Sequence, residues 1–396
     1  MRDSRVKCKL PHKHLRNEES LLNKNNTICT LIQSFLSETE LQMILAEFNY
    51  VDTARKCTVS TLISYLISAA TNEWKSLRYA ADVGPSTGLV SIDHSSLSKH
   101  MKALDYAIMK RIFEVIIGKL NRAARRTLKM PKTLLSIDST TITVGKTRLP
   151  WAVYHGERSG IKLHVNFTNE TAMPLKVVET TGLKHDGPIG ERLEDKRFIL
   201  VCDRAYFSID KVDRYVQEHQ DFVIRLKDNV QLNRKKSLKG SRTKDSNVIA
   251  DFSCTLGTPQ KQTKRRHRVI EFIDYEGKTM RVVTSLMHIT AEEIAEMYKS
   301  RWAIESFFRW IKQNLNVPVL FGTTKNAVFN QLFAALIAYV LLKFLHVHGS
   351  KKSIRKQLSF AGFTRLFLCH DLPVEWRIGV KEILIFHQQL NHLSTV

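Results

Sequence analysis

The chain has 396 residues, of which 61 are Lys or Arg and 38 are Asp or Glu, so its formal net charge is +23. Apolar residues make up 43% of the sequence and charged residues 25%. These proportions exclude a disordered basic tail and indicate a globular protein of two or three domains. A charge excess of this size predicts a polyanionic partner, most often a nucleic acid.

The cysteines and the apolar segments bear on the cellular compartment. Six Cys are scattered without a C-x-x-C pair, which favours free thiols in a reducing cytoplasm over a disulfide scaffold or zinc ribbon. The first residues are charged and show no secretory signal. The most apolar run, 332–342, is shorter than the roughly 18–20 residues that span a bilayer. It predicts a buried core helix and no membrane partner.

Helical patterns fill the region 1–125. After a polar, basic opening, Ser37 and Glu40 form a capping box that predicts the start of a helix. Further helices are expected over 60–74 and 95–121. Segments 77–81 and 95–100, joined by a Gly-containing connection, fit a helix-turn-helix reader of the major groove. An ordinary helical subdomain is an equally good interpretation of the same pattern.

From residue 133 the pattern changes to short apolar runs. Two of them, 133–138 and 197–203, end in a carboxylate, at Asp138 and Asp203. Other strands are expected at 162–167, 175–180 and 222–226. Continuous apolar strands are typical of sheets buried on both faces, so the fold class expected here is α/β.

The segment 226–285 is basic and contains strand-like pieces at 268–274 and 279–285. We interpret it as a β-rich insertion. Its many Lys and Arg residues are opposed by few acids, which favours contact with phosphates over a merely solvated charged face.

A second capping box, Thr290 with Glu293, predicts one helix from there to about residue 314. At 3.6 residues per turn, four polar side chains fall within an arc of about 60° on this helix, opposite its apolar side. They are Tyr298, Arg301, Glu305 and Lys312. A solvated face with an Arg301–Glu305 ion pair explains two of the four but gives no reason for the others to share the arc.

The acids Asp138, Asp203 and Glu305 are best interpreted together. If the strands that end in Asp138 and Asp203 are neighbours, their carboxylates meet at one edge of the sheet, and a helix alongside adds Glu305. Three carboxylates repel one another unless a cation joins them. Two Mg²⁺ ions, for which Mn²⁺ can substitute, suit such a site and its use in phosphoryl transfer. Either aspartate alone is better explained as an ordinary strand-end acid.

At this point a family resemblance becomes clear. The segments 136–141 (SIDSTT) and 202–207 (CDRAYF) resemble the two aspartate motifs of the bacterial DDE transposases named for insertion sequence four. The resemblance covers about 130–345 and includes that family's four-residue signature, Tyr298-x2-Arg301-x3-Glu305-x6-Lys312.

The resemblance implies a ribonuclease-H-like catalytic core with a β-rich insertion between Asp203 and Glu305. It implies that Asp138, Asp203 and Glu305 are the catalytic, metal-binding residues, and that phosphates at the transposon end are bound by Tyr298, Arg301 and Lys312. The implied reaction is cut-and-paste transposition of an insertion sequence, through strand hydrolysis, a hairpin intermediate and joining to target DNA. The implied partners are double-stranded DNA, as terminal inverted repeats and target, and a second copy of the chain.

The expected regions are a helical DNA-binding part (1–125), a catalytic core (126–225 and 286–350), the insertion (226–285) and C-terminal helices (351–396). Two alternatives stay open: a non-catalytic DNA-binding protein, either a repressor or a decayed transposase, and a plain ribonuclease-H-type nuclease.

Three further interpretations concern single residues. Trp302 lies near the polar arc and is a candidate for the DNA-facing edge, although packing is the commoner role for such an aromatic. Some relatives stack a flipped base on a Trp of the insertion, but residues 210–290 contain no Trp, which leaves Phe252, Phe272 and Tyr275 as candidates. The dipeptide 185–186 (His-Asp) is more consistent with a structural or DNA-proximal role than with a metal pair.

Overall fold

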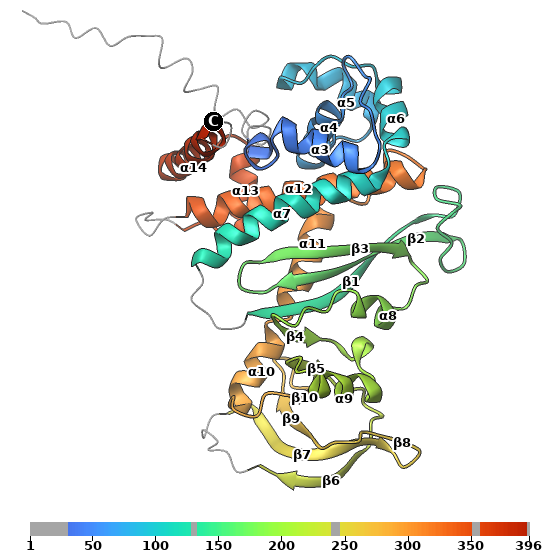
Figure 1. The fold of residues 1–396 in the computed structure, drawn as a ribbon, viewed down its shortest axis with the longest axis vertical. Coiled ribbons are helices and arrows are strands. Elements are labelled where there is room, and N and C mark those ends of the chain that lie inside the picture. Colours follow the sequence, from blue (N-terminus) through green and yellow to red (C-terminus); the bar gives the residue numbers. More distant parts are fainter. Residues whose placement is uncertain (1–30, 128–132, 239–245, 351–356, 394–396) are drawn as a thin grey trace, which may run out of the picture. The chain divides into compact units, whose positions relative to one another are not determined.

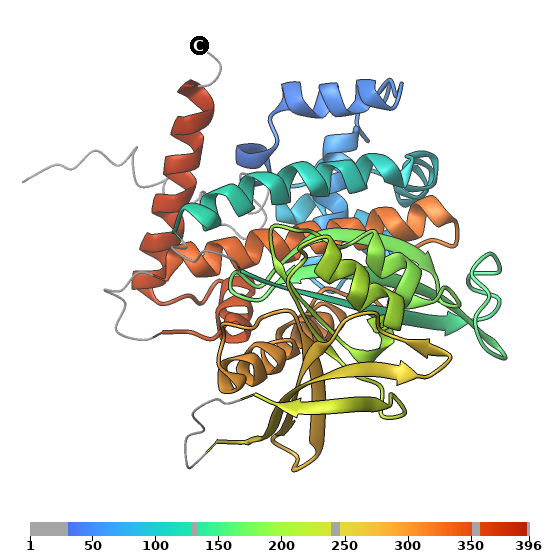
Figure 2. The same ribbon diagram turned by 60° about the horizontal axis from the view of Figure 1, so that its bottom comes forward.

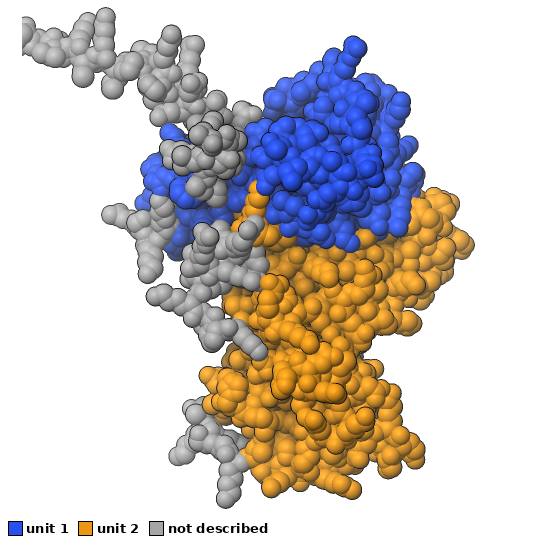
Figure 3. All heavy atoms as spheres, viewed as in Figure 1, with its two compact units in different colours: residues 1–116, 314–396 blue, residues 117–313 orange. Residues whose placement is uncertain are grey.

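The computed structural model describes residues 31–127, 133–238, 246–350 and 357–393. The chain divides into two compact units, residues 1–116 with 314–396, and residues 117–313 (Figure 3). Helices after residue 314 therefore group with the N-terminal helices, and the four-region division expected from the sequence stays a prediction. The opening residues, with Cys8 and Cys29, lie outside the described part, where the other four cysteines are free.

In its described residues the first unit is built from helices (Figure 1). The capping box at Ser37 begins α3, as predicted, because the Ser37 hydroxyl accepts the Glu40 N–H while the Glu40 carboxylate accepts the Ser37 N–H. The helices are α3 (Glu38–Glu47), α4 (Val59–Thr71), α5 (Leu77–Val83), the 3₁₀ turn η1 (Pro85–Thr87), α6 (His94–Ala103), α7 (Tyr106–Thr127, in the second unit from Ile117), α12 (Lys325–Gly349), α13 (Phe360–Leu368) and α14 (Val374–Leu393).

The helical pattern expected over 95–121 is confirmed, and it is divided between two helices, α6 and α7. The carboxylate of Asp105 accepts the Ala107 N–H at 2.9 Å and begins the second helix. The side-chain amide of Asn330, from α12, donates to the carbonyls of Met101 and Leu104 at the junction. These bonds satisfy backbone groups that an unbroken helix would pair internally.

Helix α12 is the core of the first unit and is longer than the run predicted at 332–342. It continues through Gln331, whose side chain accepts the Phe321 N–H at 2.9 Å. By length and composition this helix alone among the described residues could cross a membrane, yet 94% of its most apolar 18-residue window is buried within the protein. The predicted role as a buried core helix is confirmed, and only the predicted length is wrong.

The second unit contains a ten-stranded sheet, most of it in the order β3-β2-β1-β4-β5-β10-β9-β7-β6, with β8 paired to β7 (Figures 1 and 2). Strands β1 to β3 form an antiparallel meander, and β1, β4 and β5 are parallel neighbours. This is the ribonuclease-H-like α/β arrangement that the resemblance implied. Its strands are β1 (Leu134–Gly145), β2 (Arg158–Thr168), β3 (Met173–Thr181), β4 (Ile199–Cys202) and β5 (Phe222–Arg225).

The parallel strands are buried on both faces, as their continuous apolar sequences predicted. Alternate residues of β4 divide between two clusters: Leu200 packs beside α8 (Asp186–Glu191) and α9 (Ile209–Gln217), whereas Val201 packs beside α10 (Ala291–Lys299). Side chains alternate between the faces of a strand, so the helix that follows the insertion covers one face and the helices of the core crossovers cover the other.

The segment 226–285 is β-rich, as predicted, and it extends the core sheet rather than forming a separate one, because β10 pairs directly with β5. Its strands are β6 (Leu232–Ser237), β7 (Val248–Thr258), β8 (Lys261–Gln262), β9 (His267–Ile273) and β10 (Thr279–Thr284). Not all of its basic residues are available to phosphates. Arg268 is buried, pairs with Asp251 at 2.8 Å and donates to two backbone carbonyls, so for this residue the phosphate-contact interpretation is wrong.

Candidate active site

The two motif aspartates lie side by side on adjacent parallel strands. Ile137 of β1 pairs with Cys202 of β4 as the last registered pair, and Asp138 and Asp203 are the next residue of each chain segment. The prediction that these strands are neighbours is confirmed. The prediction that Asp138 ends its strand is wrong, because β1 continues to Gly145 through its pairing with β2.

The helix expected to carry the other site residues is broken in two. Helix α10 ends at Lys299 and α11 (Trp302–Asn314) begins three residues later. At the break, the Ser300 hydroxyl donates to the Met297 carbonyl and accepts from the Asn169 side chain of the second unit's loop after β2. A Ser that bonds back to the preceding turn commonly bends a helix. The predicted arc of polar side chains, which assumed one continuous helix, is therefore wrong.

The break sets Arg301 between the acids. Its Nη1 donates to Asp138 Oδ2 at 3.1 Å and its Nη2 donates to Glu305 Oε1, so one guanidinium bridges two of the three motif carboxylates. The third carboxylate has its own partners: the Tyr298 hydroxyl donates to Asp203 Oδ1 at 3.3 Å. Residues from β1, β4, α10 and α11 thus meet at one edge of the sheet.

Arg225 is a site residue that the sequence analysis did not single out. It ends β5, the parallel neighbour of β4, and its Nη1 lies 3.7 Å from Asp203 Oδ1. The signal was available, because the ends of adjacent parallel strands share an edge of the sheet. In the sequence Arg225 falls within the strand expected at 222–226, to which no site residue is assigned.

The electrostatics of the site are unfavourable for Asp138. Burial raises the pKa of Asp138 to about 6, and repulsion from Asp203 and Glu305 adds to the rise, against the opposing effects of Arg301 and the Ser139 N–H. Tyr298 is also buried, and its pKa lies well above the usual range, chiefly because burial disfavours the phenolate. Sites that hold charge against burial and like charge are often functional.

The carboxylates of the site are of the residue type that binds metal ions. Carboxylate oxygens are the donors that hard divalent cations prefer, and Asp138, Asp203 and Glu305 supply such oxygens. In the part of the chain that the structure describes, however, no three His, Cys, Asp or Glu side chains are grouped closely enough to hold a metal. Arg301 lies where a cation would join Asp138 and Glu305. The oxygen donors have the chemistry that a divalent cation prefers, but the guanidinium of Arg301 bridges Asp138 and Glu305 in this structure.

Lys312 lies apart from the three acids. Its Nζ donates at 3.0 Å to the carbonyl of Thr141, three residues beyond Asp138 on β1. Partial burial lowers the pKa of Lys312. It is therefore beside the site rather than in contact with the acids.

A hollow of about 190 Å³ adjoins the site on the side of Tyr298 and Arg301. Trp302, 41% exposed, and Tyr275, 68% exposed, stand at it with their rings edge to face, 5.7 Å between centroids. Of the three stacking candidates in the insertion, Phe252 and Phe272 are buried, so Tyr275 alone presents a ring to solvent.

The opposite face of β1 carries a different polar group. Asp186, the first residue of α8, accepts from the Ser139 hydroxyl at 2.8 Å and from Lys162 at 3.3 Å, and its Oδ1 lies 3.4 Å from His164 Nδ1. His164 is fully buried, and burial lowers its pKa to about 4. These contacts tie α8 to β1 and β2, a structural role that is one of the two favoured from the sequence.

Comparison with known proteins identifies the family. Residues 129–341 match the model of the transposase DDE domain family. A probable transposase for insertion sequence element IS5377 of Geobacillus stearothermophilus is 51% identical over 369 residues, which are 93% of this chain and 98% of that protein. The chain belongs to the DDE transposase family. It is accordingly an insertion-sequence transposase, an enzyme that cleaves and transfers DNA.

Other comparisons vary in strength. The putative transposase y4zB of Sinorhizobium fredii is 32% identical over 60% of this chain and 67% of its own length. The putative transposase for insertion sequence element IS4SA of Synechocystis is 25% identical over 72% of this chain and 81% of its own, consistent with the family resemblance seen in the sequence. A cryo-EM structure of the piggyBac transposase synaptic complex with hairpin DNA covers 88% of this chain and 80% of that one at 13% identity, but its TM-score of 0.46 supports no further conclusion.

Proposed function

We propose that this transposase moves its insertion sequence by a Mg²⁺-dependent cut-and-paste reaction, with Asp138, Asp203 and Glu305 as the catalytic, metal-binding residues. One observation carries the proposal: the Arg301 guanidinium bridges Asp138 and Glu305 beside the Tyr298–Asp203 hydrogen bond. Residues far apart in the sequence thereby supply both the acids that a cation needs and the donors that a phosphate needs.

The metal and the DNA end would share the site with Arg301. Bound divalent ions, two Mg²⁺ in this proposal with Mn²⁺ as a substitute, would polarise the scissile phosphodiester and activate the attacking oxygen. Arg301 would then turn its planar guanidinium from the carboxylates to phosphate oxygens, which it can bind bidentately. Tyr298 and Lys312 would donate to neighbouring phosphates. In the absence of DNA the guanidinium keeps the acids from repelling one another.

The hairpin step rests on the aromatic pair. A hairpin forms when the freed 3′-hydroxyl attacks the opposite strand, which requires tight bending and an unstacked base. Tyr275 and Trp302 stand exposed at the hollow beside Arg301, and aromatic rings stabilise an unstacked base by stacking. We propose that Tyr275 takes the place of the Trp that this insertion lacks.

The further partners follow from the reaction. Double-stranded DNA, as terminal inverted repeats and target, matches the net charge of +23. A cut-and-paste enzyme must hold two ends together, and a homodimer in the synaptic complex meets that need. The pair α5 and α6 is the proposed helix-turn-helix reader of the ends. The proposed site of action is the bacterial cytoplasm at the nucleoid.

The test uses the full chain and linear DNA that carries the element's own ends, with and without Mg²⁺ or Mn²⁺. We expect nicks, hairpins and excised product only with metal. Asp203→Asn and Glu305→Gln should bind the ends with unchanged affinity but not cut them. Binding without cleavage by the wild-type chain under either metal would favour the alternative, a decayed transposase that acts as a binder or repressor. Product from a single cut, without excision or joining, would favour the plain nuclease.

A further inference from the structure

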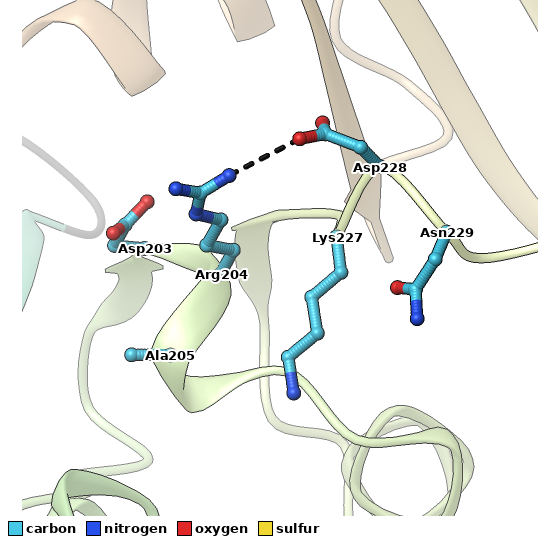
Figure 4. Close-up of a pocket in the computed structure, with 6 residues that line it drawn as sticks. All are labelled: Asp203, Arg204, Ala205, Lys227, Asp228 and Asn229. Carbon is cyan, nitrogen blue, oxygen red and sulfur yellow. Dashed lines mark hydrogen bonds and ion pairs between the residues drawn. The ribbon is translucent and has the colours of Figure 1, made fainter.

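A second hollow, of about 510 Å³, adjoins Asp203 and shares no lining residue with the aromatic hollow. It is lined by Asp203 and Arg204 at the end of β4 and by the segment 227–229 after β5 (Figure 4). The aromatic hollow, in contrast, reaches Asp203 through Tyr298 and Arg225. Asp203 therefore lines the second hollow directly, and on its other contacts it meets Tyr298 and Arg225, which line the aromatic hollow.

The lining of this second hollow suits a phosphate backbone. It offers the cations Arg204 and Lys227 and the amide of Asn229, with Asp228 as its one acid besides Asp203. Arg204 pairs with Asp228 at 3.1 Å, but both side chains are at least half exposed, and such pairs give way easily to a stronger anion. Among the described residues no acid pairs with Lys227. No aromatic side chain lines the hollow, so it has nothing on which to stack a base.

The segment is also held in place before any ligand arrives. Arg281 of β10 donates through Nη2 to the carbonyls of Lys227 at 3.1 Å and Asp228 at 2.7 Å. The Val230 N–H closes a turn onto the Lys227 carbonyl at 3.1 Å. Figure 4 shows the Lys227 side chain extending beside the turn that carries Arg204 and Ala205. A fixed backbone lets these side chains bind a phosphate without first ordering the loop.

The chemistry requires a second DNA segment at the same carboxylate. In strand transfer, the 3′-hydroxyl of the transposon end attacks a target phosphodiester, a new P–O bond forms, and the target's own 3′-oxygen leaves with a proton. The attacking and leaving oxygens lie in line on opposite sides of the phosphorus. The two DNA segments must therefore reach the metal-binding acids by different routes, and two hollows with no lining residue in common adjoin the site.

We propose that the hollow lined by Arg204, Lys227 and Asn229 binds the sugar–phosphate backbone of the target DNA, while the side of Tyr298 and Arg301 binds the transposon end. This assignment rests on the proposed function. Because the ligand is the backbone and not the base edges, binding in this hollow is independent of target sequence.

The experiment compares strand transfer with end cleavage in Lys227→Ala and Lys227→Glu, with Lys196→Ala as the control. Lys196 is exposed, pairs with Glu218 at 3.1 Å and lines neither hollow. With precleaved 3′-hydroxyl ends and plasmid target, we expect Lys227→Ala to lower transfer relative to cleavage by about tenfold, and Lys227→Glu by more, as for loss of a phosphate contact. The slope of log binding constant against log salt concentration, measured for target capture, should become shallower by about one.

Three outcomes would overturn the assignment. Equal loss of cleavage and transfer would mean that Lys227 acts in the common chemistry, and no change in either would mean that the hollow binds nothing. Loss of cleavage only on ends that carry flanking DNA, with transfer of precleaved ends intact, would assign the hollow to donor flanking DNA. If the wild-type chain cleaves no ends, the proposed function itself fails, which is distinguishable because every arm is measured against wild-type cleavage.

Discussion

Two consecutive residues of β1, Asp138 and Ser139, point to opposite faces of one sheet and meet opposite physical conditions. On the face of Asp138, three carboxylates meet, and burial raises the pKa of Asp138 to about 6, with repulsion from Asp203 and Glu305 adding to the rise. On the face of Ser139, the hydroxyl, a lysine and a buried histidine all converge on Asp186. Neither face is completely paired, since the buried Nε of Arg301 on the first and the buried Nδ1 of His164 on the second have no hydrogen-bond partner among the described residues. What distinguishes the first face is like charge, because three carboxylates meet there, and such sites are often functional.

The largest expected effect is loss of cleavage in Asp138→Asn. Removing a metal ligand should lower Mg²⁺-dependent end cleavage by about 10³-fold or more, measured as the rate of nicking on labelled ends. The same variant should be more stable than wild type in metal-free buffer above pH 6. There the wild-type carboxylate is ionised, and its raised pKa means that folding disfavours that charge.

That stability difference has a sign that can be checked. Because the folded pKa of Asp138 lies above the unfolded one, its contribution to stability is full below about pH 4 and is lost as the pH rises toward 6. A lower melting temperature for Asp138→Asn at pH 8 would contradict the description of this face as one where like charges meet. Mg²⁺ should stabilise wild type but not the variant.

The next effect concerns Arg301. Arg301→Lys should reduce cleavage by about 10–100-fold, since an ammonium cannot span Asp138 and Glu305 or bind a phosphate bidentately. Arg309→Ala is the matched control, because Arg309 is exposed on the same helix, α11. The measurement is the cleavage rate of each of the two variants at saturating DNA. Equal losses would show that the arginine between the acids has no special role.

A smaller effect is expected at the aromatic pair. Tyr275→Ala should lower the yield of hairpin by roughly tenfold, the size of one base–aromatic stacking interaction, with little change in the first nick. Tyr275→Phe keeps the ring and should retain hairpin formation. If both variants fall alike, the hydroxyl and not the ring is the working part, and the stacking proposal fails.

The smallest effect is expected on the face of Ser139. His164 is buried with its pKa lowered to about 4, so protonation opposes folding, and stability should fall as the pH drops from about 6.5 toward 4. We expect this to contribute about 1–2 kcal/mol to acid destabilisation. His164→Gln should flatten that part of the curve in urea melts at pH 5 and pH 7, while cleavage at pH 8 keeps its metal dependence. An unchanged pH slope in the variant would show that His164 is not the group responsible.

The helix after Thr290 shows what a periodic sequence pattern can and cannot predict. The capping box is formed as predicted, and Tyr298 and Arg301 do contact the acids, but Lys312 lies apart from them and the helix is not continuous. A wheel assumes regular backbone, and the break at Ser300 depends on Asn169, more than a hundred residues away. No local pattern contains that contact. The position of Arg225 likewise depends on a tertiary contact, because the pairing of β4 with β5 puts it near Asp203.

The sequence by itself determined the α/β class, the two-sided burial of the short strands, the acidic motif residues and the charge that suits DNA, because these depend on composition and on local periodicity. Only the tertiary structure decided that the insertion continues the core sheet through β10, that Arg268 forms an internal ion pair, and that one guanidinium lies between two of the motif carboxylates. The reason is that register, burial and ion pairing depend on which distant segments meet, and a linear pattern does not specify those neighbours.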